Sequence, residues 1–306
     1  MGNIAFVFPG QGSQYPGMGR DLYENNNAAR AVFEMAEGIR PGTLSLIFDG
    51  AEDDLKKTSN TQPAMFCVEL AIAAALADAG VQPNRLAGFS LGEITALAFS
   101  GAVSYEDGFR MVVLRAQLMQ KASETNNASM AAVLKLSDAA VEQICREFTD
   151  VYPVNYNCPG QVVVSGPAEE LAIFGERVKN AGGRTMALKV GGAFHSPFMQ
   201  VAANEFLSEL SSFDIKAPGL PLYSNMTAAP YSGDILPLLA GQICSPVLWS
   251  KTIQNMINDG IDIFIESGPG KVLSGLISRI SSDIKVYNVE DTAGVVDLCE
   301  EIGIRG

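Results

Sequence analysis

Five consecutive residues, Gly88-Phe89-Ser90-Leu91-Gly92, form the pattern G-x-S-x-G. Glycines in this pattern allow the chain to turn sharply from a strand into a helix, so that the serine hydroxyl stands exposed at the start of the helix. Backbone amides at that position can stabilise an oxyanion that develops during acyl transfer. A short strand candidate at 86–89 and an amphipathic pattern at 91–99 provide this context. Ser90 is therefore a candidate nucleophile, and the alternative is an inert serine in a structural turn.

A serine hydroxyl is a weak nucleophile and needs an adjacent base, which is usually an imidazole. The chain contains a single histidine, His195, in the sequence Gly-Gly-Ala-Phe-His-Ser-Pro. If an imidazole activates Ser90, it must belong to His195. The alternative is a lone histidine on a surface loop, but the glycine pair before it and the proline after it indicate a shaped turn. Standard α/β-hydrolases place their histidine late in the chain, after an acidic partner, and the order here is different.

One arginine lies in an apolar helical pattern. Arg115 falls within 111–119, where Met111, Leu118 and Met119 are three or four positions away and share its face. A cation on an apolar face is costly unless it is paired with an anion. Composition alone favours a structural salt bridge with an internal Asp or Glu.

The order of predicted elements indicates an α/β body with a smaller insertion. An apolar strand at 4–8 opens the chain, helical patterns then alternate with short strands, and 261–266 reads as a further strand. Such alternation predicts a parallel sheet covered on both faces. Between the first strand and the strand at 261–266, residues 128–190 have the predicted order β-α-β-β-α-β, which is the ferredoxin-like order. We therefore predict a catalytic body at 1–123 and 191–306 and a small α+β subdomain at 124–190.

Composition limits the possible locations and partners. The 306 residues carry a net charge of −13, which disfavours binding to nucleic acid. Five scattered cysteines without C-x-x-C spacing argue against a disulfide framework or a zinc cluster and favour a reducing cytoplasm. No signal-peptide pattern is visible. The longest apolar stretch, at 64–80, contains Glu69 and Asp78, so we expect a buried helix rather than a membrane span.

Taken together, six motifs resemble the malonyl-CoA:acyl carrier protein transacylases of fatty acid synthesis and the related acyltransferase domains of polyketide synthases. The motifs are FPGQGSQ at 8–14, TQPA at 61–64, GFSLGE at 88–93, NCPGQVVVSG at 157–166, AFHS at 193–196 and GPGKVL at 268–273. The resemblance covers nearly the whole chain. It implies an α/β-hydrolase-like body with a ferredoxin-like subdomain, in agreement with the predicted order of elements.

The resemblance also assigns roles to individual residues. It places the nucleophile at Ser90 and the base at His195, and it implies that the backbone carbonyl of Gln242 orients the histidine. The implied oxyanion donors are the backbone amides of Gln11 and Leu91.

For Arg115, the resemblance implies a grip on the malonyl carboxylate, and a guanidinium suits such a bidentate contact. Phe194 before the histidine and Leu91 after the nucleophile are of the malonyl-selecting type. One departure is Phe89, where the family usually has histidine, so a polar contact to the acyl group would be lost.

The implied activity is transfer of a malonyl group from malonyl-CoA to the phosphopantetheine thiol of an acyl carrier protein, with no metal or bound redox cofactor. Three alternatives remain open: an acyltransferase serving a polyketide synthase, a hydrolase that clears acyl groups from stalled carriers, and a non-catalytic docking subunit. Arg115 argues against the hydrolase, which gains little from a carboxylate clamp. We expect a monomer.

A cluster of basic residues is a candidate docking surface for the acidic carrier protein. Arg177, Lys179, Arg184 and Lys189 occur with no acid between them, shortly before the His195 loop, and Lys271 could extend the cluster. The alternative is a solvated helix end and strand.

Overall fold

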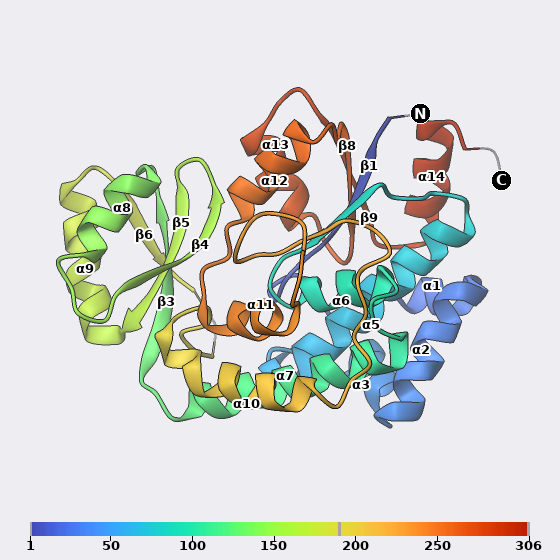
Figure 1. Ribbon diagram of the computed structural model, residues 1–306, viewed down its shortest axis with the longest axis horizontal. Helices are drawn as coiled ribbons and strands as arrows, with labels where there is room; N and C mark the ends of the chain where they lie inside the picture. Colours follow the sequence, from blue (N-terminus) through green and yellow to red (C-terminus); the bar gives the residue numbers. More distant parts are fainter. Residues whose placement is uncertain (1, 189–190, 305–306) are drawn as a thin grey trace.

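Two sheets organise the chain in this computed structural model, which describes residues 2–188 and 191–304 (Figure 1). The larger sheet is parallel, with strand order β7-β2-β1-β8-β9. Its strands are β1 (Ile4–Phe8), β2 (Arg85–Gly88), β7 (Leu222–Tyr223), β8 (Ile263–Ser267) and β9 (Lys285–Val289). Every residue of β1 and β8 is buried, because helices cover both faces of the sheet, as is usual for parallel sheets.

The alternation of side chains along β1 divides the core into two layers. Phe6 and Phe8 face the layer that contains α5, α6 and α7, whereas Ala5 and Val7 face the layer that contains α12 and α13. Helices that contribute to these two layers include α2 (Asn27–Ile39), α5 (Thr58–Asp78), α6 (Gly92–Phe99), α7 (Tyr105–Glu124), α12 (Trp249–Asn258) and α13 (Val272–Ile280). The other helices of the body are α1 (Arg20–Asn25), α3 (Thr43–Asp49), α4 (Glu52–Leu55), α10 (Gln200–Leu210), α11 (Leu236–Gly241), α14 (Thr292–Ile302) and the 3₁₀ turns η1 (Pro197–Met199) and η2 (Gln242–Cys244).

The smaller sheet is antiparallel and forms a separate lobe, on the left in Figure 1. Its order is β4-β5-β3-β6, and helices α8 and α9 share a core with it. The elements are β3 (Ala128–Leu134), α8 (Asp138–Cys145), β4 (Tyr152–Cys158), β5 (Gln161–Pro167), α9 (Ala168–Asn180) and β6 (Arg184–Ala187). The predicted β-α-β-β-α-β order and the α/β class are confirmed. The predicted limits 124–190 remain a prediction, and Glu124 is the last residue of α7.

The lobe joins the body through main-chain hydrogen bonds that bring distant segments together. The Tyr156 amide donates to the Val247 carbonyl at 2.9 Å, and the Val247 amide donates to the Val154 carbonyl at 2.9 Å. The lobe enters the chain between α7, which carries Arg115, and the loop that carries His195. Two candidate residues therefore flank the insertion.

The apolar stretch at 64–80 forms most of α5, which is buried along nearly its whole length, including Glu69. The expected buried helix is confirmed. Within residues 2–188 and 191–304, no helix has both the length and the apolar character that crossing a membrane requires.

Two glycines of the G-x-S-x-G pattern are explained by packing at the point where β2 meets α6. A Cβ added to Gly92 would lie 2.2 Å from the Phe8 carbonyl oxygen, and one added to Gly88 would lie 1.9 Å from the Gly92 carbonyl carbon. Both contacts are with backbone, which cannot rotate away. The glycines therefore allow the turn to pack directly against the end of β1.

We predict that Gly92→Ala lowers the free energy of unfolding by about 3 kcal/mol, because the added methyl group overpacks the backbone. Gly275→Ala is the matched control: Gly275 lies within α13 with nothing within 4 Å of an added Cβ, and alanine there should stabilise by about 0.5–1 kcal/mol. Denaturant unfolding of both variants measures the difference. A Gly92→Ala protein as stable as the wild type would contradict this explanation.

Candidate active site

Ser90 lies at the turn between β2 and α6, and its backbone is held in an uncommon conformation. Its φ is +56°, in the left-handed region that serine rarely occupies. Asn225 braces this turn from outside: its Oδ1 accepts from the Ser90 amide at 2.8 Å, and its Nδ2 donates to the Gly88 carbonyl at 2.6 Å. The strained turn is thus tied at both sides by one buried amide side chain, and Ser90 itself stays partly exposed.

His195 lies directly beside the serine. Its Nε2 is 2.8 Å from Ser90 Oγ, and its Nδ1 is 2.8 Å from the Gln242 carbonyl oxygen. Because a carbonyl oxygen only accepts, Nδ1 carries the proton and Nε2 is free to accept from the serine hydroxyl. Burial, and then the nearby positive charge of Arg115, lower the pKa of His195 to about 4. At neutral pH the imidazole is therefore uncharged and can act as a base.

Arg115 on α7 is completely buried and points at the same hydroxyl. Its Nη2 donates to Ser90 Oγ at 3.1 Å and to Gln242 Oε1 at 2.7 Å, and its Nη1 donates to Gln62 Oε1 at 2.6 Å. Burial lowers the pKa of Arg115 to about 10, so the group remains charged.

The salt bridge that composition alone favours for Arg115 is not present. Across residues 2–188 and 191–304, no carboxylate oxygen lies within 4.0 Å of its guanidinium nitrogens, and Nε has no hydrogen-bond partner. Neutral amides hold the guanidinium instead. A buried cation without a direct anionic partner is suited to receive an anion from outside the protein.

The two predicted oxyanion donors lie on either side of the junction between β1 and the turn at Ser90. The Phe89 amide donates to the Phe8 carbonyl at 2.8 Å, which holds the loop that carries Gln11 close to the turn that carries Leu91. Gln11 is fixed further because its Oε1 accepts from Gln62 Nε2 at 3.0 Å. Within the part of the chain that the structure describes, the backbone amides of Gln11 and Leu91 donate to no protein acceptor, so both are free to donate to an oxyanion.

Phe194 and Phe89 both belong to apolar surroundings. Phe194 directly precedes the base and packs into the main core, with 6% of its surface exposed. Phe89 packs edge-on against Trp249, with ring centroids 5.5 Å apart. The selectivity predicted for Phe194 remains a prediction.

The sequence analysis assigned no role to three buried polar residues of the site: Gln62, Glu93 and Asn225. Glu93 accepts from Gln242 Nε2 at 2.7 Å and from the Tyr231 hydroxyl. A signal existed for two of them, because Gln62 opens an apolar helix and Glu93 is an acid in the apolar pattern at 91–99. Asn225 lies far along the chain from Ser90, and no spacing connects the two.

The predicted basic cluster lies at the far end of the small lobe. Arg177 and Lys179 are in the last turn of α9, and Arg184 begins β6, which runs from there toward the His195 loop. All three are exposed, and Arg177 Nε lies 3.5 Å from a Glu147 carboxylate oxygen. Lys189 lies outside the described residues.

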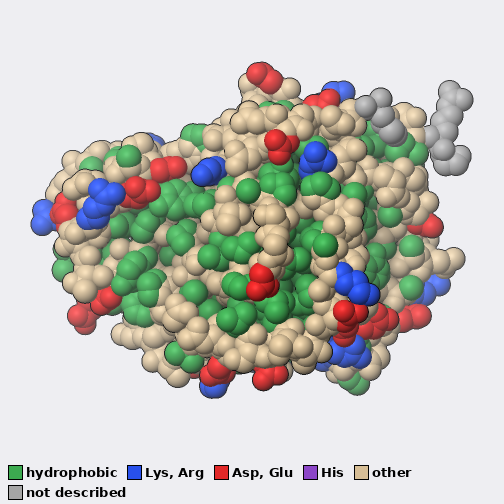
Figure 2. Space-filling model, viewed as in Figure 1, with side chains coloured by type: hydrophobic (Ala, Val, Ile, Leu, Met, Phe, Trp, Pro, Cys, Tyr) green, Lys and Arg blue, Asp and Glu red, His purple; other side chains and the backbone are tan. Residues whose placement is uncertain are grey.

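Lys271 lies apart from that cluster, at the start of α13. The preceding Gly270 packs beside Ser13, two residues after Gln11, so Lys271 lies near the oxyanion loop. On the face shown in Figure 2, hydrophobic side chains gather between the lobe and the body, and basic side chains are scattered among acidic ones.

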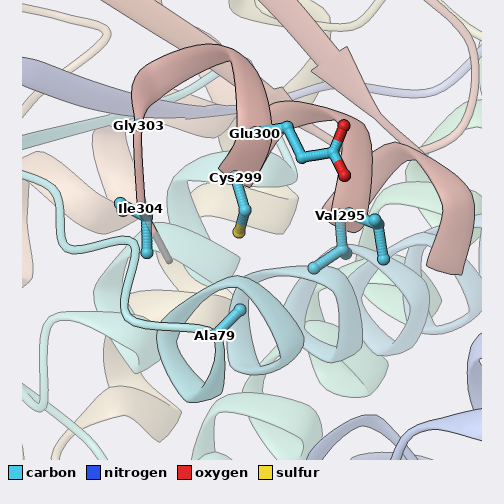
Figure 3. Close-up of a pocket in the computed structure, with 7 residues that line it drawn as sticks. Ala79, Val295, Cys299, Glu300, Gly303 and Ile304 are labelled. Atoms are coloured by element: carbon cyan, nitrogen blue, oxygen red, sulfur yellow. The ribbon is translucent and has the colours of Figure 1, made fainter. Parts of the chain in front are cut away.

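A separate hollow lies between the end of α5 and α14 and contains none of these residues (Figure 3). Ala79, Val295, Cys299 and Ile304 line it. No cluster of three or more His, Cys, Asp or Glu side chains that could hold a metal ion occurs in the described ranges 2–188 and 191–304.

Comparison with known proteins gives a consistent result. The family model for the acyl transferase domain matches residues 5–293. A malonyl CoA-acyl carrier protein transacylase from Bacillus subtilis is 39% identical over 95% of this chain and 94% of its own length. The crystal structure of the transacylase of the same name from Clostridium perfringens matches with a TM-score of 0.95 and 36% identity, covering 98% of this chain and 97% of that one.

A malonyl-transacylase solved in complex with a type II PKS acyl-carrier protein matches with a TM-score of 0.94 and 32% identity, covering 98% of this chain and 99% of its own. The family match, the identities and the shared fold extend over nearly the entire chain. The chain therefore belongs to the acyl transferase family that includes the malonyl CoA-acyl carrier protein transacylases.

Proposed function

We propose that this chain transfers a malonyl group from malonyl-CoA to the phosphopantetheine thiol of an acyl carrier protein, through a malonyl-serine intermediate. One observation carries the proposal: Ser90 Oγ contacts both an uncharged imidazole and a buried guanidinium that lacks a carboxylate partner within the described residues. The first contact activates a nucleophile, and the second offers a place for the carboxylate that distinguishes malonyl from acetyl.

The first half-reaction forms an ester on Ser90. The hydroxyl passes its proton to His195 Nε2 while Oγ attacks the thioester carbonyl carbon. The amides of Gln11 and Leu91 donate to the oxyanion that develops. When the carbon–sulfur bond breaks, the imidazolium returns the proton to the departing CoA sulfur. The Gln242 carbonyl, at 2.8 Å from Nδ1, holds the ring in place throughout.

In the second half-reaction the carrier's thiol takes the position of CoA. His195 removes the thiol proton while sulfur attacks the ester carbonyl carbon. The bond between that carbon and Ser90 Oγ then breaks, and the imidazolium gives the proton to Ser90 Oγ. Water must be kept from the ester, since the same base would otherwise hydrolyse it. The mechanism uses no metal or redox cofactor.

Arg115 separates this function from acyl clearance. A hydrolase that removes assorted acyl groups gains little from a buried cation aimed at the ester, whereas a malonyl transferase needs it for selectivity. Fatty acid synthesis is the pathway we propose. Service to a polyketide synthase would use the same chemistry with another carrier protein. The cytoplasmic location and the monomeric state also remain predictions.

Intact-protein mass spectrometry after brief mixing with malonyl-CoA tests the proposal. The wild type should gain one malonyl group, and carrier protein should then remove it. Ser90→Ala should gain none, because it lacks the hydroxyl that contacts the His195 imidazole. A folded wild-type protein that gains no malonyl group would favour the docking-subunit alternative, and an adduct retained on Ser90→Ala would place the nucleophile elsewhere.

The carrier protein is acidic, so exposed positive charge near the oxyanion loop and on the small lobe should guide its approach. We expect Lys271→Glu, and the pair Lys179→Glu with Arg184→Glu, to raise the Michaelis constant for carrier protein about threefold or more. The constant for malonyl-CoA should be unchanged. Lys216→Glu is the control. The Lys216 amide donates to the carbonyl of Ala102, which follows the C-terminal end of α6, whereas Ser90 lies at the opposite, N-terminal end of that helix. If all variants keep the wild-type constants, these side chains do not guide docking.

A further inference from the structure

Glu93 is a fully buried acid three residues after the nucleophile, and the proposed chemistry does not use it. Its carboxylate accepts from Gln242 Nε2 at 2.7 Å, from the Tyr231 hydroxyl, and more weakly from the Asn225 amide at 3.3 Å. Each of these partners donates a hydrogen. The surroundings of Glu93 are therefore built for an acceptor.

The Gln242 side chain connects Glu93 to the arginine. Its Nε2 donates to both Glu93 Oε2 and the Ser90 carbonyl, each at 2.7 Å, while its Oε1 accepts from Arg115 Nη2 at 2.7 Å. Because the two acceptors require the amide nitrogen, the amide oxygen must face Arg115. One amide group thus separates the buried carboxylate from the buried guanidinium.

This arrangement makes Glu93 the internal counter-charge of Arg115. Burial lowers the pKa of Arg115 and raises the pKa of Glu93, and the charge of each group partly offsets the shift of the other. Because the contact is indirect, the guanidinium face toward Ser90 stays available. A carboxylate arriving from solvent would be attracted by Arg115 and repelled by Glu93.

We propose that Glu93 is a positioning residue that partly offsets the charge of Arg115 and so weakens the hold on the substrate carboxylate, which lets the acyl group leave for the second acceptor. The inference rests on the proposed function. A site that bound malonyl equally tightly before and after each step would not speed the chemical step, because uniform binding leaves the barrier unchanged, and it would slow release of the product.

The effect of Glu93 on thioester binding can be measured at equilibrium with variants that lack the Ser90 nucleophile and therefore cannot be acylated there. Ser90→Ala and the double variant Ser90→Ala/Glu93→Gln are titrated with malonyl-CoA and with acetyl-CoA by calorimetry. Glutamine keeps the shape of Glu93; its oxygen can accept from Gln242 while its amide nitrogen donates to Tyr231, whose hydroxyl can also accept. At about pH 8.5, where Glu93 is ionised, removing its charge should tighten malonyl-CoA binding about tenfold, for charges interacting at an effective dielectric near 20. Acetyl-CoA binding should not change.

Glu69→Gln in the Ser90→Ala background is the matched control. Glu69 of α5 is also fully buried, and its carboxylate accepts from the Thr95 hydroxyl of α6, but within the described residues it bonds neither Arg115 nor Gln242. Burial raises its pKa well above the usual range. Its malonyl-CoA affinity should equal that of Ser90→Ala. Tighter malonyl-CoA binding in the control would overturn the assignment to Glu93.

The pH dependence of malonyl-CoA affinity distinguishes this role of Glu93 from a purely structural one, which would not make the affinity depend on the charge of Glu93. Burial raises the pKa of Glu93 to about 7. Burial lowers the pKa of His195 to about 4 and raises the pKa of Tyr231 well above its ordinary value, so neither of these groups titrates near neutrality. Malonyl-CoA binding to Ser90→Ala, relative to acetyl-CoA, should therefore strengthen as the pH falls through 7 and Glu93 takes up a proton. The double variant should lose this dependence.

The outcomes separate the inference from the proposed function. If Glu93→Gln leaves malonyl-CoA affinity unchanged, or weakens binding of both thioesters equally, the inference is overturned. If Ser90→Ala itself binds malonyl-CoA no better than acetyl-CoA, the carboxylate site of the proposed function fails, and the inference fails with it.

Discussion

The burial of the Arg115 guanidinium beside Ser90 is the constraint on which the rest of the site depends. A cation removed from water must be hydrogen-bonded or paired, and here Gln62 and Gln242 supply neutral oxygens at 2.6 and 2.7 Å. Each amide then uses its nitrogen elsewhere: Gln62 holds Gln11, and Gln242 holds the turn at Ser90. The groups that hold the arginine are thus the groups that fix the oxyanion loop and the nucleophile.

Both reacting residues are among the four non-glycine residues of the described ranges whose φ is positive, the other two being Lys135 and Ala228. Ser90 and His195 have φ values of +56° and +62°, and such conformations in residues other than glycine cost of order 1–3 kcal/mol each. The parallel sheet and its helices compensate through close packing of β1 against the turn at Ser90. Asn225 and the Ile243 carbonyl, which accepts from the His195 amide at 3.1 Å, hold the strained segments.

Local patterns were enough to predict much of this structure. The apolar run of β1, the turn at Ser90 and the ferredoxin-like order of the lobe follow from periodicity and glycine placement, and a single histidine left one candidate imidazole. The partners of Arg115 could not be predicted this way, because helical spacing shows only which residues share its face. An internal salt bridge seemed the natural solution. The protein instead surrounds the cation with amides from α5 and η2, whose approach depends on tertiary packing.

The most direct test of the account is the ratio of Ser90 acylation rates from malonyl-CoA and acetyl-CoA, measured in single-turnover experiments. Replacing Arg115 by alanine should lower this ratio by about a hundredfold, the loss expected for a charge-assisted bidentate contact. Arg115→Lys, which keeps the charge but not the planar fork, should give an intermediate ratio. Equal losses with both thioesters would contradict the account, because Arg115 would then support the serine or the fold without recognising the carboxylate.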